Sequence, residues 1–480
     1  MPIQETKWSK YYDKTKIVDD FDTNRTIYQV LKDSAEKYPD RIIIRYGSTR
    51  FTYKQFLTIV DTAASSMVSI GIKKGDVVTL SHSGMPASVS AIYAASKIGA
   101  TVSLINNALT SSRLSEIVQI TGSKHFFLSN WKYSDFIDFY ENVDTDITSV
   151  IVKTRDYTTW SFRLNPIYNK YRVGDINRDY KKNRNSHVKI LTRNEFLAKS
   201  GEAVEPVTDS SLPVVLFHSG SATGAPIPVC ASSKALNSKV LPYSYLVNLS
   251  RENGEPVKTF SCVKQTFSFG LTLSIHATIA MGDTIMLFPN AGLSDPIAEI
   301  KMYKPDVLIA YPKVFSLMME PQVMGEANLS FLKGIICAGE SMSGVMSNDF
   351  RIFLKKHKCH APLYRLYGLT ESLSAVCYNP PEFDNDSILG IPLPGVNMKI
   401  MDRATGMEMP VGSKGEICIS YPGNMDGYYK DPVMTSEIMR RLKDGKTWLF
   451  TGDFGKEDEN GIFYFEGHSK RVVDMGGVHV

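Results

Sequence analysis

The chain has 480 residues, of which 43% are hydrophobic and 22% charged, and its formal net charge is +4. This length is more than one hydrophobic core supports, so we expect about two to four packed units of a globular protein. So small a net charge gives no support for a polyanionic partner. The six cysteines are scattered without a C-x-x-C pair. That pattern excludes a short-spaced disulfide framework and favours buried thiols in a reducing compartment.

The N-terminal residues 1–14 are polar and lack the apolar core of a signal peptide. The best candidate for a membrane span is 87–105, which Lys97 and Gly99 interrupt. We therefore expect a buried helix followed by a strand there, and a cytoplasmic protein.

The first part of the chain alternates helices with strands. Apolar residues at helical spacing predict helices over 26–38, 53–70, 85–98 and 110–121, and strands over 41–46, 51–53, 77–82, 100–105 and 125–129. This alternation is typical of a doubly wound parallel sheet. We assign residues 1–205 to a first α/β subdomain.

A basic stretch interrupts this pattern at about 155–195. Between residues 163 and 193 it carries nine Lys and Arg residues against Asp175 and Asp179, interleaved with Tyr. Such a stretch could bind nucleic acid or the surface of an anionic membrane. A solvated insertion is the simpler interpretation, and we favour it, with no nucleic acid as a partner.

A second α/β series is predicted over 206–385. Its candidate strands are 259–263, 283–289, 307–312, 334–340 and 364–371. From 386 to 466 the strands become short and alternating, separated by Gly, Pro and Asp turns, which predicts a small antiparallel β-barrel subdomain.

The most informative loop follows the apolar run 214–217. It contains small and hydroxyl residues that would surround a phosphate chain with backbone N–H groups and side-chain donors: Ser219, Gly220, Ser221, Thr223 and Gly224. A tight turn between two strands is the alternative interpretation. The spacing of the glycines, without a following Gly-Lys-Ser/Thr, excludes a Walker loop.

Three further segments follow predicted strands. Tyr367-Gly368-Leu369-Thr370-Glu371 should lie at the carboxyl edge of the second sheet, where open α/β sheets bind ligands. A tyrosine face can stack on a purine, a threonine hydroxyl can donate, and a carboxylate can hold Mg²⁺. Ala338-Gly339-Glu340 and Thr451-Gly452-Asp453 are similar strand-end turns. Each segment by itself is more often structural than functional.

The order and spacing of these segments resemble the adenylate-forming (ANL) superfamily and its AMP-binding domain. That superfamily includes acyl-CoA synthetases, luciferases and the adenylation domains of peptide synthetases. Within it, the chain is most similar to bacterial fatty acyl-CoA synthetases. The matching segments are GIKKGDVVTL, HSGSATGAP, KPDVLIAYP, AGESMS, YGLTES, GYYKDP and WLFTGDFG.

The resemblance implies ATP-dependent activation of a carboxylic acid, most simply a fatty acid, to an acyl-adenylate and then to a CoA thioester. It also implies a role for each matching residue. The loop from Ser219 to Gly224 would hold the β- and γ-phosphates, Thr370 the α-phosphate and Glu371 the Mg²⁺. Tyr367, Gly368 and the backbone of Ala338, Gly339 and Glu340 would surround adenine, and Asp453 and His468 the ribose. Phe267, Phe269 and Gly270 would line the acyl pocket.

Several positions depart from the family pattern. Ile227 stands where a lysine usually follows the loop, Ala222 replaces a threonine, Phe267 a histidine and His468 an arginine. The sequence ends at Val480, so residues 467–480 are interpreted as the remnant of an interdomain hinge and the C-terminal lid is expected to be absent. The alternative is therefore a degenerate member that binds nucleotide or acyl ligand without turnover. The oligomeric state stays open, as does a peripheral contact with a membrane.

Overall fold

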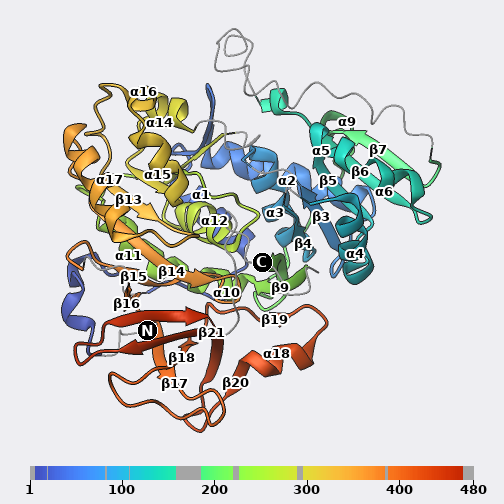
Figure 1. Cartoon of the computed structure of the whole chain (residues 1–480). Coiled ribbons are helices and arrows are strands. Elements are labelled where there is room, and N and C mark those ends of the chain that lie inside the picture. Colours follow the sequence, from blue (N-terminus) through green and yellow to red (C-terminus); the bar gives the residue numbers. More distant parts are fainter. Residues whose placement is uncertain are drawn as a thin grey trace.

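The computed structural model describes residues 6–18, 20–81, 84–106, 109–157, 185–219, 226–288, 296–383 and 387–468. Two sheets organise these residues. Figure 1 shows β3 to β7 on one side of the molecule, β13 to β15 on the other, and the antiparallel strands β16, β17, β18 and β21 below them.

The first sheet has eight strands in the order β19-β9-β8-β4-β3-β5-β6-β7. From β8 to β7 all its neighbours are parallel, which confirms the predicted doubly wound arrangement. Its strands are β3 (Val77–Ser81), β4 (Thr101–Leu104), β5 (His125–Ser129), β6 (Ile147–Val152), β7 (Val188–Thr192), β8 (Pro213–Ser219), β9 (Ile227–Ser232) and β19 (Gly427–Tyr428). Its helices include α1 (Ile27–Lys37), α2 (Tyr53–Ser69), α3 (Pro86–Ile98), α4 (Ser111–Thr121), α5 (Asn130–Asp135), α6 (Ile137–Asn142) and α9 (Arg193–Leu197).

The candidate phosphate loop connects two antiparallel strands of this first sheet. β8 and β9 pair up to Ser219 and Ile227, and β8 also pairs with β4. Residues 220–225, which include Gly220, Ser221, Ala222, Thr223 and Gly224, lie outside the described residues. The boundary expected at residue 206 precedes β8 and β9, whereas their pairing joins them to the first sheet.

The second sheet continues through fourteen strands. Its parallel part runs β14-β13-β12-β10-β11-β1, and the hairpin β1–β2 from the start of the chain forms its far edge. The strands are β1 (Ile42–Tyr46), β2 (Thr49–Thr52), β10 (Lys258–Ser261), β11 (Thr284–Leu287), β12 (Val307–Ala310), β13 (Gly334–Cys337), β14 (Leu363–Leu369) and β15 (Ser374–Asn379). Its helices include α10 (Ser233–Ser238), α11 (Val240–Asn248), α12 (Ser268–Leu271), α13 (Thr278–Ala280), α14 (Ile297–Tyr303), α15 (Pro312–Met319), α16 (Pro321–Met324) and α17 (Gly344–Lys356).

The C-terminal strands are antiparallel, as expected, but they form an open path. They pair in the order β17-β18-β21-β22-β16, and β16 then pairs with β15 of the large sheet. The predicted separate barrel is therefore not confirmed among the described pairings. The elements are β16 (Ile388–Pro392), β17 (Asn397–Met401), β18 (Gly415–Ser420), α18 (Pro432–Ile438), β20 (Met439–Arg441), β21 (Thr447–Glu457) and β22 (Phe463–His468).

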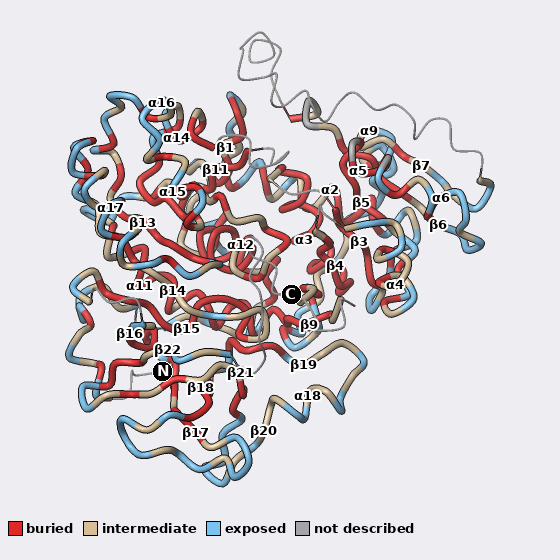
Figure 2. Tube along the Cα trace, viewed as in Figure 1, coloured by how far each residue is buried: buried red, intermediate tan, exposed pale blue. Residues whose placement is uncertain are grey.

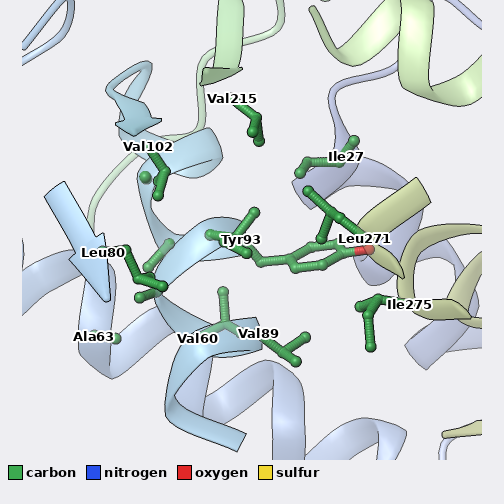
Figure 3. Close-up of a cluster of buried hydrophobic side chains, with 14 of the residues drawn as sticks. Ile27, Val60, Ala63, Leu80, Val89, Tyr93, Val102, Val215, Leu271 and Ile275 are labelled. Carbon is green, nitrogen blue, oxygen red and sulfur yellow. The ribbon is translucent and has the colours of Figure 1, made fainter. Parts of the chain in front are cut away.

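One hydrophobic cluster contains buried residues of both α/β parts, and Figure 2 shows the buried stretches of both parts in red. In Figure 3, Tyr93 of α3 extends toward Leu271 and Ile275, which belong to the helical segment after β10. The Tyr93 hydroxyl hydrogen-bonds His276 Nδ1 at 2.9 Å, and His276 Nε2 lies 2.7 Å from Asn237 Oδ1. Burial lowers the pKa of His276 to about 3, so this histidine is a neutral part of the core and not a base.

None of the described helices is long and apolar enough to cross a membrane. The candidate span 87–105 is divided between α3 and β4, as its composition predicts. All six cysteines are buried and free. Most of the basic stretch, residues 158–184, lies outside the described part of the chain.

Candidate active site

Two neighbouring parallel strands, β13 and β14, end at one edge of the second sheet. Ala338 continues β13 by donating its N–H to the carbonyl of Ala310, and Gly339 follows with a φ of +88°. A left-handed φ at this turn suits glycine, which has no Cβ to clash. The turn leaves Gly339 exposed and Glu340 partly exposed beside the end of β14.

The chain reverses sharply after β14 because a glycine permits two backbones to touch. A Cβ on Gly368 would lie 2.2 Å from the carbonyl oxygen of Ser374 in β15. Two residues of the turn, Leu373 and Ser374, have φ values of +51° and +131°. Left-handed backbone at non-glycine residues costs free energy and persists only where the surroundings hold it. The strained turn presents Thr370 and Glu371 at the sheet edge, both partly exposed.

A chain of hydrogen bonds joins three of the predicted nucleotide residues. The Tyr367 hydroxyl donates to Asp453 Oδ2 at 2.6 Å, and His468 Nδ1 lies 2.5 Å from Asp453 Oδ1. Asp453 lies within the long strand β21, and its side chain is only 14% exposed. The pKa of Tyr367 is raised well above its usual value, first by burial and then by the Asp453 carboxylate. Tyr367 is therefore a neutral hydrogen-bond donor.

Glu371 contacts two residues: Tyr428, and Ser219 at the start of the candidate phosphate loop. The Tyr428 hydroxyl donates to Glu371 Oε1 at 3.1 Å. Burial raises the pKa of Glu371, and hydrogen bonds that include those from Tyr428 and Ser219 partly oppose this rise. The carboxylate thus lies beside the last residue of β8, at the start of the loop.

Tyr428 is a residue whose contact the sequence did not predict. It belongs to β19, a two-residue strand that pairs with β9. The segment GYYKDP carried the resemblance to the family, but nothing in its spacing indicates a contact with Glu371. A tertiary contact across 57 residues brings the two together.

The predicted acyl-pocket residues surround the start of α12. Phe267 and Phe269 are partly exposed, and Gly270 lines a cavity of about 400 Å³, counting its open mouth. A Cβ on Gly270 would lie 2.1 Å from the backbone oxygen of Lys264, so only glycine permits this packing. The described lining does not include the two phenylalanines.

Comparison with known proteins shows the family of the chain. A family model described as "AMP-binding enzyme" matches residues 31–429. A long-chain-fatty-acid–CoA ligase of Bacillus subtilis is 23% identical over 95% of this chain and 79% of the relative. A probable 4-coumarate–CoA ligase of Dictyostelium discoideum is 24% identical over 92% of this chain and 76% of the relative.

Solved structures share the fold. A long-chain-fatty-acid–CoA ligase from Archaeoglobus fulgidus superposes with a TM-score of 0.76 at 19% identity, covering 93% of this chain and 84% of that one. An anthranilate–CoA ligase in complex with anthranoyl-AMP gives 0.75 at 17% identity, covering 95% and 80%. Since the family model spans well over half of the sequence, the chain belongs to the family of AMP-binding enzymes, as an acyl-CoA synthetase-like ligase that activates a carboxylic acid with ATP.

Proposed function

We propose that ATP and the carboxylic acid meet at the edge formed by the ends of β13 and β14, facing β21 and β22. The observation that carries this proposal is the hydrogen-bonded chain of Tyr367, Asp453 and His468. These residues are separated by 86 and 15 positions, and the resemblance to the adenylate-forming superfamily implies a contact with the nucleotide for all three. In this proposal Tyr367 stacks on adenine beside Ala338, Gly339 and Glu340, while Asp453 accepts hydrogen bonds from the ribose hydroxyls.

The phosphates would lie between β14 and the loop that begins at Ser219. Thr370 would donate to the α-phosphate, and Ser219 would begin the row of donors that we assign to Gly220, Ser221, Thr223 and Gly224. The substrate carboxylate attacks the α-phosphorus, the bond to the bridging oxygen breaks, and pyrophosphate leaves. Donors held in place before the reaction stabilise the charge that develops in this step.

Glu371 would hold the Mg²⁺ that accompanies ATP. The described residues contain no group of three or more acidic, His or Cys side chains that could hold a metal ion by themselves. A single carboxylate still fits Mg²⁺, because this ion is usually bound by one or two carboxylates together with substrate phosphates. Burial disfavours the charged form of Glu371 and raises its pKa, and a bound cation would stabilise that charged form. When bound, the ion neutralises phosphate charge.

The acid would extend from this edge toward α12 and the cavity that Gly270 lines. The relatives' names include a long-chain fatty acid and 4-coumarate, and the cavity walls are largely apolar. We therefore propose an acid with a hydrophobic body, such as a fatty acid, and CoA as the acceptor. We place the reaction in the cytoplasm, supported by six free, buried thiols.

Release of pyrophosphate from ATP, measured with a panel of carboxylic acids, tests this function. Glu371→Gln should lower the rate by about two to three orders of magnitude, because it removes the charge opposite the metal. Glu326→Gln is the matched control, because Glu326 is exposed and distant in sequence from the site. Equal rates in Glu371→Gln and the parent protein would contradict the assignment.

A further inference from the structure

The cavity beside α12 combines apolar walls with a small group of polar side chains. Its lining includes Lys264, Gln265 and Ser274, and apolar residues of β11 such as Ile285 and Met286. Gly84, which follows β3 of the first sheet, also contributes. The cavity therefore lies where the two α/β parts meet.

Gln265 is the most informative residue of this lining. Its side chain is 3% exposed, and neither Nε2 nor Oε1 has a hydrogen-bond partner among the described residues. Ser274 Oγ is likewise buried and unpaired. It lies in the π-helical segment Thr272–Ala277, a rare geometry that is frequent at functional sites. Because buried polar groups in proteins are nearly always paired, these atoms are available to hydrogen-bond a polar ligand.

Lys264 adds a positive charge to the same cavity. Its side chain is partly buried, and no carboxylate of the described residues forms an ion pair with it. Burial lowers the pKa of Lys264, so an anionic ligand would remove a desolvation cost that the protein otherwise bears. The contact of Gly270 with the Lys264 backbone fixes the position of this turn.

The position of the cavity along the sheet sets the length of its ligand. From β14 to β10 the sheet has three steps, through β13 and β12. Adjacent strands are about 4.8 Å apart, so Thr370 and the turn after β10 are separated by roughly 14 Å. An acid that reaches from one to the other is an extended chain and not a small aromatic acid.

We propose that this cavity selects a carboxylic acid whose apolar chain ends in a second carboxylate, bound by Lys264, Gln265 and Ser274. The ammonium, the amide N–H and the hydroxyl are donors for one anionic group, and β11 supplies the apolar wall for the chain. This inference rests on the proposed function, because the first carboxylate is the one that ATP activates.

The test compares α,ω-dicarboxylic acids with monocarboxylic acids of the same chain length. Pyrophosphate release and calorimetric binding are both measured on the whole 480-residue protein, in the parent chain and in Lys264→Met and Gln265→Leu. The parent should favour the diacid in kcat/KM by at least about tenfold, which corresponds to one charge-assisted hydrogen bond. Each variant should lose most of this preference, through a higher KM for the diacid than for the monocarboxylic acid. Lys199→Met, an exposed lysine, is the control.

The two readouts separate this inference from the function on which it rests. A diacid that binds in a Lys264-dependent manner, without pyrophosphate release by any acid, would support the cavity and overturn the function. Pyrophosphate release with equal preference for both kinds of acid would overturn the cavity inference alone. Equal loss of pyrophosphate release with both kinds of acid in the variants would also overturn it, because this result would indicate a structural role of Lys264 and Gln265.

Discussion

The two ends of the proposed site differ in whether their polar side chains are hydrogen-bonded. At the nucleotide end, Tyr367, Asp453 and His468 satisfy one another through hydrogen bonds of 2.6 and 2.5 Å. At the cavity end, Gln265 and Ser274 are buried without a described partner. The first arrangement is held in place before any ligand arrives. The second leaves its polar atoms unpaired at a cost in stability, which a ligand can recover.

The largest effect is expected when the hydrogen bonds of the nucleotide end are removed. Asp453→Ala removes the acceptor for the ribose and leaves Tyr367 and His468 without their shared partner. We expect ATP binding, measured by calorimetry, to weaken on the order of a hundredfold, as for the loss of one or two charged hydrogen bonds. Asp349→Ala, on the exposed face of α17, should bind ATP as the parent does.

Asp453→Asn completes this experiment, because it keeps the size of the side chain and one acceptor oxygen. An ATP affinity of Asp453→Asn between those of the parent and Asp453→Ala would support the assignment of Asp453 to the ribose. If Asp453→Ala retains a native thermal transition and the parent's affinity, the ribose does not lie at Asp453.

A smaller effect, a gain in stability, is expected at the cavity end of the site. Gln265→Leu replaces a buried amide, which has no partner among the residues that the structure describes, by an apolar side chain of similar size. We expect the free energy of unfolding of the ligand-free protein to rise by about 1–3 kcal/mol, measured by denaturant titration. Gln119→Leu on the exposed surface of α4 should change it little. A loss of stability in Gln265→Leu would show that the amide is already paired in the free protein.

The smallest effect concerns the pH dependence of stability at Glu371. Its pKa is raised in the folded protein, mainly by burial, above the value of about 4.3 in an unfolded chain. Between these two pKa values the folded state binds more protons than the unfolded state. The contribution of Glu371 to stability therefore decreases as pH rises through this window. Glu371→Gln should therefore be more stable than the parent at neutral pH, and the difference should vanish below about pH 4.

Denaturant titrations of both proteins across this pH range measure the effect. Glu326→Gln, whose carboxylate is exposed, should follow the parent at every pH. A constant difference between Glu371→Gln and the parent would mean that Glu371 titrates normally, and that burial does not disfavour its charge.

Local sequence patterns predicted most elements of the two parallel sheets. Val307–Ala310 and Gly334–Cys337 form strands within the predicted ranges, and the helix and strand expected in 87–105 are α3 and β4. Short-range periodicity is enough here, because buried parallel strands and amphipathic helices have distinct spacings. The separate barrel was not confirmed, because alternation along a strand specifies its two faces and not its neighbours.

The sequence by itself determined the chemistry of the residues at the strand ends and the family to which they point. Only the tertiary structure decided which of them meet. The hairpin of β1 and β2 lies at the far edge of the second sheet, and β8 with β9 belongs to the first. Likewise, Tyr428 lies against Glu371, and Gln265 lines a cavity without a partner in the described part of the chain. Long-range pairing and burial depend on the whole chain, and no local pattern contains them.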